Sequence, residues 1–320
     1  VTITNKSAQE KEILLWGGNL SSVSVPLASD VQDHTITSQI SIPTGVHPQG
    51  IAVNPANQLI YIANQLSGSV TVLDAANLVV KEIQLEPSFP GFASPVALAA
   101  NTKSSSSTYG FVYVVCSVSN QLAVIDLSLN VLAYVPLGIR PVAITFNLVN
   151  LQLYVANLVS DDLSVIDAEN FTEVIGSPFA VGQDPIGLGI HPINGEIYIA
   201  NSLSNSITVY NSNNILVTTI VGVGQYPVSI TYNPANNAMY AVATVSNNLF
   251  QINALTHALS APIPVGNSPY NSFYDAANSF LYVQNRVDNT LSVIQSDNSL
   301  VATLSLGEQN IGGAFNSFNN

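Results

Sequence analysis

The side chains best suited to chemistry in this sequence share one position: each stands directly before the residue that opens an apolar segment. His47, Arg140, Asp184 and Tyr226 are the ionisable members, and the other positions of this kind are Ser94, Ser268 and Asn310. Arginine and histidine can bind an anion, and a carboxylate or phenol can bind a hydroxyl or move a proton. If the segments are related by rotation, these residues converge on a site for an anionic or hydroxylated ligand. The alternative is that they are variable turn residues facing water.

Familiar catalytic and metal-binding patterns are absent from the sequence. It has no Gly-x-Ser-x-Gly, no His-Glu-x-x-His, no phosphate-binding glycine loop and no Cys-x-x-Cys, and its four histidines are scattered. We therefore expect no cofactor and no metal. Asp161-Asp162 is a carboxylate pair in a turn that can hold calcium together with carbonyl oxygens, but a solvated turn is the favoured interpretation.

The composition is acidic but sparsely charged. Lys plus Arg number 6 and Asp plus Glu number 19, the net charge is −13, and charged residues make up 8% of the chain. This charge repels phosphate, which argues against nucleic acid and anionic membranes as partners. No apolar run approaches the ~20 residues that span a bilayer, so we expect no transmembrane segment. Hydration must come from Ser, Asn, Thr and Gln, which favours an extracellular or cell-surface location.

Two further residue types bear on the compartment. Asn-x-Ser/Thr sequons at Asn5, Asn19 and Asn170 can carry N-linked glycans outside the cell, although chance matches are expected in a chain so rich in these residues. Cys116 is the single cysteine and lies in an apolar stretch. We predict that it is a buried small hydrophobe, and no disulfide can form within the chain.

A segment centred on an aromatic residue, Leu59–Asn64, recurs along the chain. Aromatic residues occupy the equivalent position of every copy, in chain order Trp16, Tyr61, Tyr113, Tyr154, Tyr198, Tyr240 and Tyr282. The intervals between them are 45, 52, 41, 44, 42 and 42 residues. Each tyrosine copy follows a segment opened by proline, such as Pro48–Pro55, and precedes two more strand-like segments, such as Ser69–Asp74 and Leu78–Leu85. Repeats of this length with four short strands predict an all-β fold: a seven-bladed β-propeller of four-stranded antiparallel blades, forming one domain over residues 1–320.

These repeats resemble a known family. The Tyr-Val-Ala-Asn core, the preceding Pro-x-x-Ile/Ala-x-Asn-Pro and the following Ser-Val-Ile-Asp are similar to the YVTN family of β-propeller repeats, over residues 13–316. The resemblance implies a bladed ring, often in secreted or surface-layer-associated bacterial and archaeal proteins, and it implies no single activity. The chain departs from the pattern at Trp16 and at an insertion, Ser104–Ser107, which we predict to be a surface loop.

The two ends of the chain are predicted to meet in one blade. Residues 312–319 align without gaps with residues 50–57, the first strand of the second repeat, whereas the Trp16 repeat lacks such a segment. We therefore expect the C-terminal strand to join the N-terminal blade and close the ring. Val1–Thr4 is the alternative candidate for that strand.

The sequence leaves more than one function open. The favoured one is a non-catalytic extracellular or surface-exposed module that binds other surface proteins or glycans, or assembles with copies of itself. The low charge, the sequons, the family resemblance and the missing catalytic motifs support it. The rival is a propeller enzyme of the lyase or lactonase kind, with its site at the channel mouth around Arg140 and Asp184. A periplasmic cofactor-binding protein is a weaker third reading.

Overall fold

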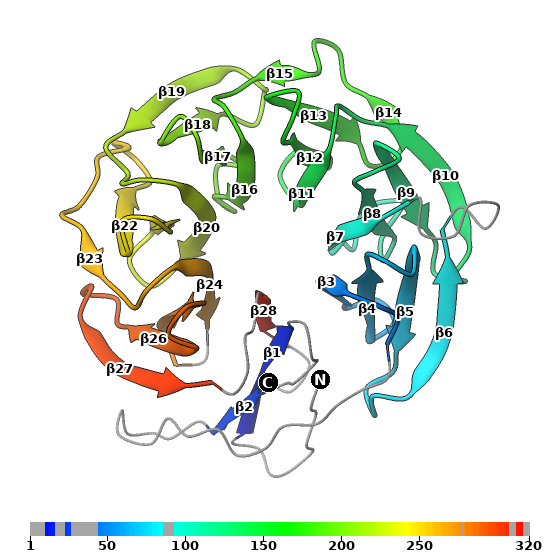
Figure 1. Cartoon of the computed structure of the whole chain (residues 1–320). Coiled ribbons are helices and arrows are strands. Elements are labelled where there is room, and N and C mark those ends of the chain that lie inside the picture. Colours follow the sequence, from blue (N-terminus) through cyan, green and yellow to red (C-terminus); the bar gives the residue numbers. More distant parts are fainter. Residues whose placement is uncertain are drawn as a thin grey trace. The chain divides into compact units, whose positions relative to one another are not determined.

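The computed structural model describes residues 10–16, 23–26, 44–85, 93–276, 278–306 and 312–315. Across these ranges the secondary structure consists of strands and turns (Figure 1). The same ranges contain no helix long and apolar enough to cross a membrane. The chain divides into two compact units, residues 44–219 and residues 1–43 with 220–320, which we take in turn.

The 44–219 unit contains four antiparallel sheets that follow one another along the chain. In each, consecutive strands are hydrogen-bonded neighbours, except that the fifth strand of the third sheet pairs with the third strand of that sheet. The first sheet contains β3 (Pro48–Asn54), β4 (Leu59–Asn64), β5 (Ser69–Leu73) and β6 (Val79–Gln84), and the second contains β7 (Pro95–Ala100), β8 (Val112–Cys116), β9 (Gln121–Ile125) and β10 (Val131–Pro136). The third contains β11 (Pro141–Asn147), β12 (Gln152–Asn157), β13 (Asp162–Asp167) and the short β14 (Thr172–Glu173) and β15 (Phe179–Ala180). The fourth contains β16 (Pro185–Ile190), β17 (Ile197–Asn201), β18 (Ser206–Tyr210) and β19 (Leu216–Val221).

The second unit contains two four-stranded sheets and one three-stranded sheet. The four-stranded sheets are β20 (Pro227–Asn233), β21 (Ala238–Ala243), β22 (Asn248–Asn253) and β23 (Ile263–Pro264); and β24 (Pro269–Asp275), β25 (Phe280–Asn285), β26 (Thr290–Ile294) and β27 (Leu300–Ser305). The third has the order β2 (Val23–Pro26), β1 (Glu10–Trp16), β28 (Gly312–Phe315). In it Trp16 faces Gly312 and Leu15 faces Gly313, so the C-terminal segment pairs with the Trp16 strand. Val1–Thr4 lies outside the described residues.

Local sequence explains where each strand lies in its sheet. The second and third strands, such as β4 and β5, are buried almost throughout, which matches their continuous apolar residues. The first strand opens with a proline and has a register shift directly after it, as at Pro48, where a missing N–H costs no ladder bond. The fourth strand is mostly exposed; in β6 only Ile83 is buried.

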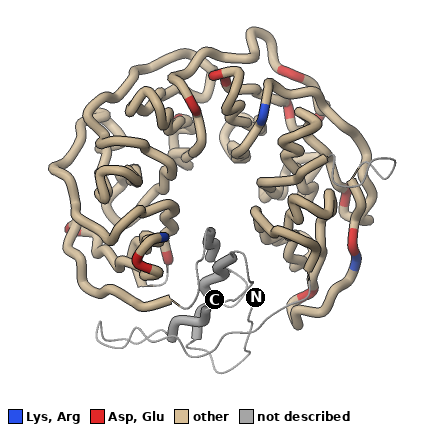
Figure 2. Tube along the Cα trace, viewed as in Figure 1, with Lys and Arg blue, Asp and Glu red and all other residues tan. Residues whose placement is uncertain are grey.

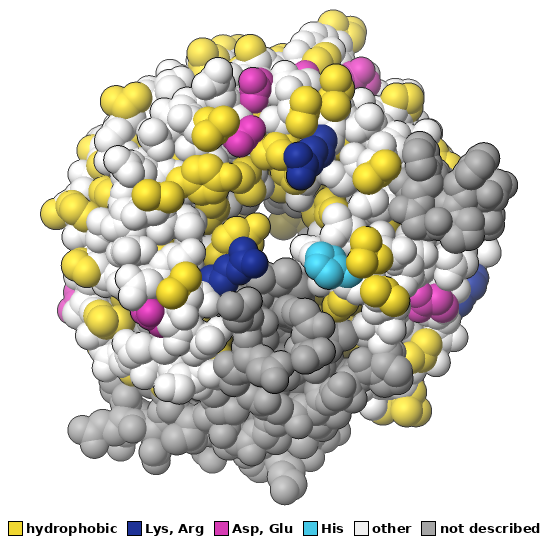
Figure 3. Space-filling model, in the orientation of Figure 1, with side chains coloured by type: hydrophobic (Ala, Val, Ile, Leu, Met, Phe, Trp, Pro, Cys, Tyr) yellow, Lys and Arg dark blue, Asp and Glu magenta, His cyan; other side chains and the backbone are white. Residues whose placement is uncertain are grey.

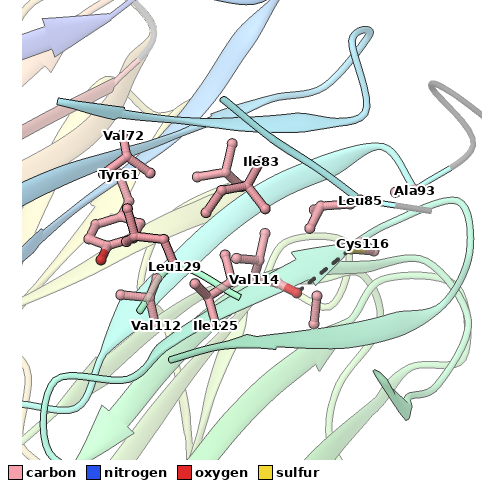
Figure 4. Packing of buried hydrophobic residues seen from close by; sticks show 12 residues of the cluster. Tyr61, Val72, Ile83, Leu85, Ala93, Val112, Val114, Cys116, Ile125 and Leu129 are labelled. Atoms are coloured by element: carbon pink, nitrogen blue, oxygen red, sulfur yellow. Dashed lines mark hydrogen bonds between the residues drawn. The ribbon is translucent and has the colours of Figure 1, made fainter. Parts of the chain in front are cut away.

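The core lies between successive sheets. Figure 4 shows one such cluster, in which Tyr61 and Val72 of one sheet pack near Val112, Val114 and Ile125 of the next. Cys116 is fully buried in this cluster, as predicted, and its thiol lies 3.8 Å from the Val114 carbonyl oxygen.

Three of the recurring tyrosines, Tyr113, Tyr154 and Tyr240, donate hydrogen bonds to a neighbouring sheet. All six are fully buried: Tyr61, Tyr113, Tyr154, Tyr198, Tyr240 and Tyr282. The Tyr113 hydroxyl donates to the Ala168 carbonyl at 2.8 Å, and the Tyr154 hydroxyl donates to Asn214 Oδ1 at 2.7 Å. A buried phenol needs such a partner, so this residue contributes both apolar area and a polar link between sheets.

The insertion in the second sheet differs in part from a surface loop. Ser104, Ser105 and Ser107 are exposed, but Ser106 is buried and its hydroxyl accepts a 2.9 Å hydrogen bond from Asn101 Nδ2. The Ser107 N–H donates to the carboxylate of Glu169, in the next sheet, at 3.0 Å. The insertion is therefore partly structural, because it ties two sheets together.

Candidate binding surface

The predicted site residues occupy one repeated backbone position. His47, Arg140, Asp184 and Tyr226 all have a positive φ, of 59°, 55°, 52° and 60°, directly before β3, β11, β16 and β20. Their carbonyls accept hydrogen bonds from equivalent N–H groups, those of Gln65, Leu158, Ser202 and Thr244. Ser94 and Ser268 share this conformation, and Asn310 lies outside the described residues. These positions are thus turns of the same geometry, which we call the opening turns.

Three of these side chains lie at one end of the 44–219 unit. The first strands of its four sheets contact each other in succession, β3 with β7, β7 with β11 and β11 with β16. His47, Arg140 and Asp184 precede three of these strands and therefore stand at the same end. Tyr226 belongs to the second unit and holds the equivalent position there.

The contacts of these three residues do not assemble a catalytic group. His47 Nδ1 lies 2.8 Å from Gln65 Oε1 and 2.8 Å from Gln49 Nε2, so its ring is held by amides rather than by a carboxylate. The guanidinium of Arg140 is exposed, and its backbone N–H donates to Asn120 Oδ1 at 2.7 Å. Within the described ranges the side chains of His47, Arg140 and Asp184 make no contact with one another that resembles an acid–base pair.

The Asp161-Asp162 pair has structural partners. Asp161 Oδ1 accepts the N–H of Asp184 at 2.9 Å, and Asp162 Oδ1 accepts hydrogen bonds from Asn157 Nδ2 at 2.6 Å and Ser160 Oγ at 3.0 Å. These carboxylate oxygens hold the turn in place. No cluster of three or more His, Cys, Asp or Glu side chains that could hold a metal ion occurs among the residues that the structure describes.

A recurrent feature that our sequence reasoning missed lies in the hairpin tips, the turns between the second and third strands of the complete sheets. Two residues after the end of the second strand, every tip carries an aliphatic side chain that is 54–67% exposed: Leu66, Val118, Val159, Leu203, Val245 and Val287. The signal is present in the sequence as a Leu or Val followed by Ser or Asp in each repeat. The polar residues around it, such as Gln65 and Ser67 around Leu66, do not show whether its side chain is buried or exposed.

The residues that flank this aliphatic position have clear structural roles. The asparagine that ends the second strand, as at Asn157, is fully buried and its Nδ2 donates to Ser164 Oγ at 2.9 Å. The serine that follows the aliphatic residue accepts an N–H of an opening turn, as Ser67 Oγ does from Val46 at 2.6 Å and Ser160 Oγ does from Ile139 at 3.0 Å. Hairpin tip and opening turn are therefore one hydrogen-bonded structure, from which the aliphatic side chain projects into solvent.

In the 44–219 unit these side chains form a set that we call the aliphatic row. It consists of the four tip residues of that unit and two exposed residues of the opening turns: Val46, Leu66, Val118, Ile139, Val159 and Leu203. The N–H of Leu66 donates to the Val46 carbonyl and that of Val159 to the Ile139 carbonyl, so two pairs of the row are neighbours. Figure 3 shows hydrophobic side chains spread among uncharged polar ones over the face drawn.

The opposite ends of the same sheets have a different character. The turns there carry acidic residues, namely Asp74, Asp126, Asp167, Glu169 and Glu196, and Lys103 is the basic residue among the described turns of that end. Charged residues are sparse along the whole described trace (Figure 2). Acidic side chains therefore outnumber basic ones at both ends of the described unit, and the aliphatic row lies at the end that carries the exposed Arg140.

Of the three sequons, the structure describes the one at Asn170. Asn170 is exposed in the turn between β13 and β14, with its backbone N–H donating to Asp167 Oδ1 at 2.9 Å, and Thr172 of the same sequon is also exposed. Asn5 and Asn19 lie outside the described residues.

Comparison with known proteins identifies the fold. Neither a protein-family model nor a curated protein sequence matches the chain. Virginiamycin B lyase from Staphylococcus aureus is similar in structure, with a TM-score of 0.68 and 15% identity over 82% of this chain and 86% of that one. A streptogramin B lyase has a TM-score of 0.68 and 18% identity over 93% and 89%. A protein of unknown function from Desulfotomaculum acetoxidans has a TM-score of 0.73 and 13% identity over 95% and 98%. Structural neighbours of the chain are β-propeller proteins, so the predicted β-propeller fold is supported. At these identities the likeness shows the fold alone.

Proposed function

We propose that this protein is a non-catalytic binding module of the cell surface or extracellular space, and that it contacts another protein through the aliphatic row. The observation that carries the proposal is the exposed Leu or Val at every described hairpin tip. Singly exposed apolar residues are ordinary, but one that projects into solvent at the same position of six sheets marks a surface that another molecule covers.

We also propose the architecture in which this module works: a single YVTN-type domain over residues 1–320, with seven blades closed by the C-terminal strand. The pairing of β28 with β1 supports closure. Asn289 supports it as well. Asn120 Oδ1 accepts the N–H of Arg140 and Asn247 Oδ1 that of Ser268 in the following sheet, but the buried Oδ1 of Asn289 has no partner among the described residues. The next opening position in the chain is Asn310, which lies outside the described residues.

Sparse charge and an exposed sequon support the extracellular location. A surface hydrated by uncharged polar groups suits a compartment in which binding is not governed by charge. The turn at Asn170 leaves both the asparagine and Thr172 accessible to a glycosylating enzyme. Mass spectrometry of the protein isolated from its source tests this part. A glycan at Asn170 supports it, and an unmodified asparagine in every molecule contradicts glycosylation.

Binding through the aliphatic row is tested on cells of the source organism. We compare the labelled wild-type protein with the double variant Val159→Asp/Leu203→Asp and with the control Leu127→Asp/Ile193→Asp, in which exposed residues of the opposite end are changed. Saturable binding that the row variant weakens by at least about tenfold, while the control retains it, supports the proposal. Equal binding by all three proteins, or competition by free glycans rather than by surface protein, overturns it.

A lyase is the second candidate, because His47, Arg140 and Asp184 stand at one end of one unit. Streptogramin B, the compound class in one neighbour's name, is the substrate to try first. We expect no product after prolonged incubation, since the ring of His47 is held by two amides and has no carboxylate partner. Turnover that is lost in Arg140→Ala and Asp184→Asn would replace the binding proposal by an enzymatic one.

A further inference from the structure

The aliphatic row carries an inference about the partner, which rests on the proposed function. We propose that the occupant of the row is the row of a second copy of this chain, so that two copies pack face to face about a twofold axis. A twofold contact uses the same surface on both copies, so the surface must be complementary to itself in apolar area and in charge.

The apolar area is close to what such a contact needs. A Val, Leu or Ile side chain offers roughly 100 Å² of apolar surface, and the six residues of the row are 54–63% exposed, which leaves about 350 Å². A standard interface buries about 800 Å² per partner, of which a little more than half, or roughly 450 Å², is apolar. The row therefore supplies most of the apolar part, and the polar atoms of the tips and opening turns surround it.

The charges at this end are of both signs. The exposed guanidinium of Arg140 shares the end with the carboxylates of Asp161, Asp162, Asp184 and Glu82. Asp161 Oδ1 accepts the Asp184 N–H, Asp162 Oδ1 accepts from Asn157 and Ser160, and Glu82 Oε2 accepts from Thr71. Two copies related by a twofold axis can set Arg140 of each against Asp184 of the other. A surface of a single sign would instead repel its own copy.

The charges at the opposite end of the unit disfavour a contact between two copies of that end. Five acidic turn residues share that end with Lys103 and with the ammonium of Lys81, which donates to the Leu129 carbonyl at 2.7 Å, so acidic groups outnumber basic ones there and two copies of this end repel each other. At the end with the row, the exposed Arg140 can meet a carboxylate of the second copy, and the aliphatic side chains add apolar contact.

The oligomeric state of the purified full-length chain tests the proposal. Sedimentation velocity between about 1 and 100 μM covers the affinity range of an interface of this size. We expect a concentration-dependent dimer in the wild type, a Kd raised at least about 100-fold in Val159→Asp/Leu203→Asp, and a change of less than about threefold in the control Leu127→Asp/Ile193→Asp. Circular dichroism and the melting temperature confirm that each variant is folded.

A charge exchange tests the orientation independently of the row. Arg140→Asp alone and Asp184→Arg alone should each weaken the homodimer, and an equimolar mixture of the two variants should recover dimerisation as a mixed pair. A wild type that is monomeric at every concentration overturns the proposal, as does a dimer that persists in the folded row variant. In either case the function proposed above still stands if the row variant has lost binding to cells, and it falls separately if that binding is unchanged.

Discussion

Replacing Tyr113 by phenylalanine tests whether the buried tyrosine hydroxyls hold neighbouring sheets together. The side chain is fully buried, and its hydroxyl donates to the Ala168 carbonyl at 2.8 Å and lies 3.2 Å from Thr108 Oγ1. Phenylalanine preserves the packing of the ring but leaves the carbonyl without this donor. We expect the free energy of unfolding of Tyr113→Phe to be lower by about 1–3 kcal/mol at neutral pH.

The pH dependence of this difference identifies its cause. Burial raises the pKa of Tyr113 to about 12, and the carboxylates of Asp167 and Glu169 add to the shift. The unfolded value is about 10, so the folded state holds the proton more tightly. The stability from this group is therefore fully present below pH 10 and is lost as the pH rises through 12. For one such group the loss is about 1.4 kcal/mol at pH 11 and about 2.3 kcal/mol at pH 12.

Urea denaturation at pH 8, 10 and 11, followed by circular dichroism, measures the effect. The quantity to compare is the difference in unfolding free energy between the wild type and Tyr113→Phe, because the other tyrosines titrate in both proteins. We expect this difference to fall by about 1.4 kcal/mol between pH 8 and pH 11. Tyr134→Phe, at an exposed position in the outermost strand β10, is the control and should give a difference independent of pH. A Tyr113→Phe difference that stays constant or grows with pH refutes the reasoning.

Three further outcomes are expected. Gly138→Ala should lower the free energy of unfolding by about 1–3 kcal/mol, because the new Cβ would lie 2.5 Å from Asn157 Nδ2 and 2.6 Å from Ser160 Oγ; an unchanged urea midpoint would contradict this packing. Deleting residues 311–320 removes the strand paired with Ile13–Trp16 and should lower the melting temperature by about 10 °C or more, whereas deleting residues 1–5 should change it by less than about 2 °C; equal effects would count against the closing role of β28. Between pH 6 and pH 3 the melting temperature should change by less than about 5 °C. Hydrogen bonds lower the pKa values of Glu169, Asp288 and Asp297, so their contribution is lost as the pH falls through their folded-state pKa values, but these carboxyl groups are exposed and protonation relieves a net charge of −13. A steep fall in the melting temperature over this range would show that the paired carboxylates dominate.

The strand pattern was largely predictable from the sequence, because it depends on neighbours along the chain. The predicted Leu59–Asn64 segment is β4 with the same bounds, and the predicted first strands at Pro141 and Pro269 begin at those prolines. Apolar runs, opening prolines and turn residues act within a few residues of one another, so a linear reading captures them. The equal placement of His47, Arg140, Asp184 and Tyr226 directly before an opening proline was also visible in the sequence, and the structure adds that all four share a positive φ.

Contacts between distant residues were decided by the tertiary structure alone. Ser106 is buried because Asn101 and a carboxylate 63 residues away converge on it, which no local pattern records. The amides around His47 and the structural partners of Asp161 and Asp162 were likewise invisible in the sequence. Most of all, the sequence around Leu66 and its counterparts does not show that these side chains are exposed, and the fold places them on hairpin tips in solvent. Exposure and hydrogen bonding depend on which segments pack around a residue, and that is settled only when the sheets assemble.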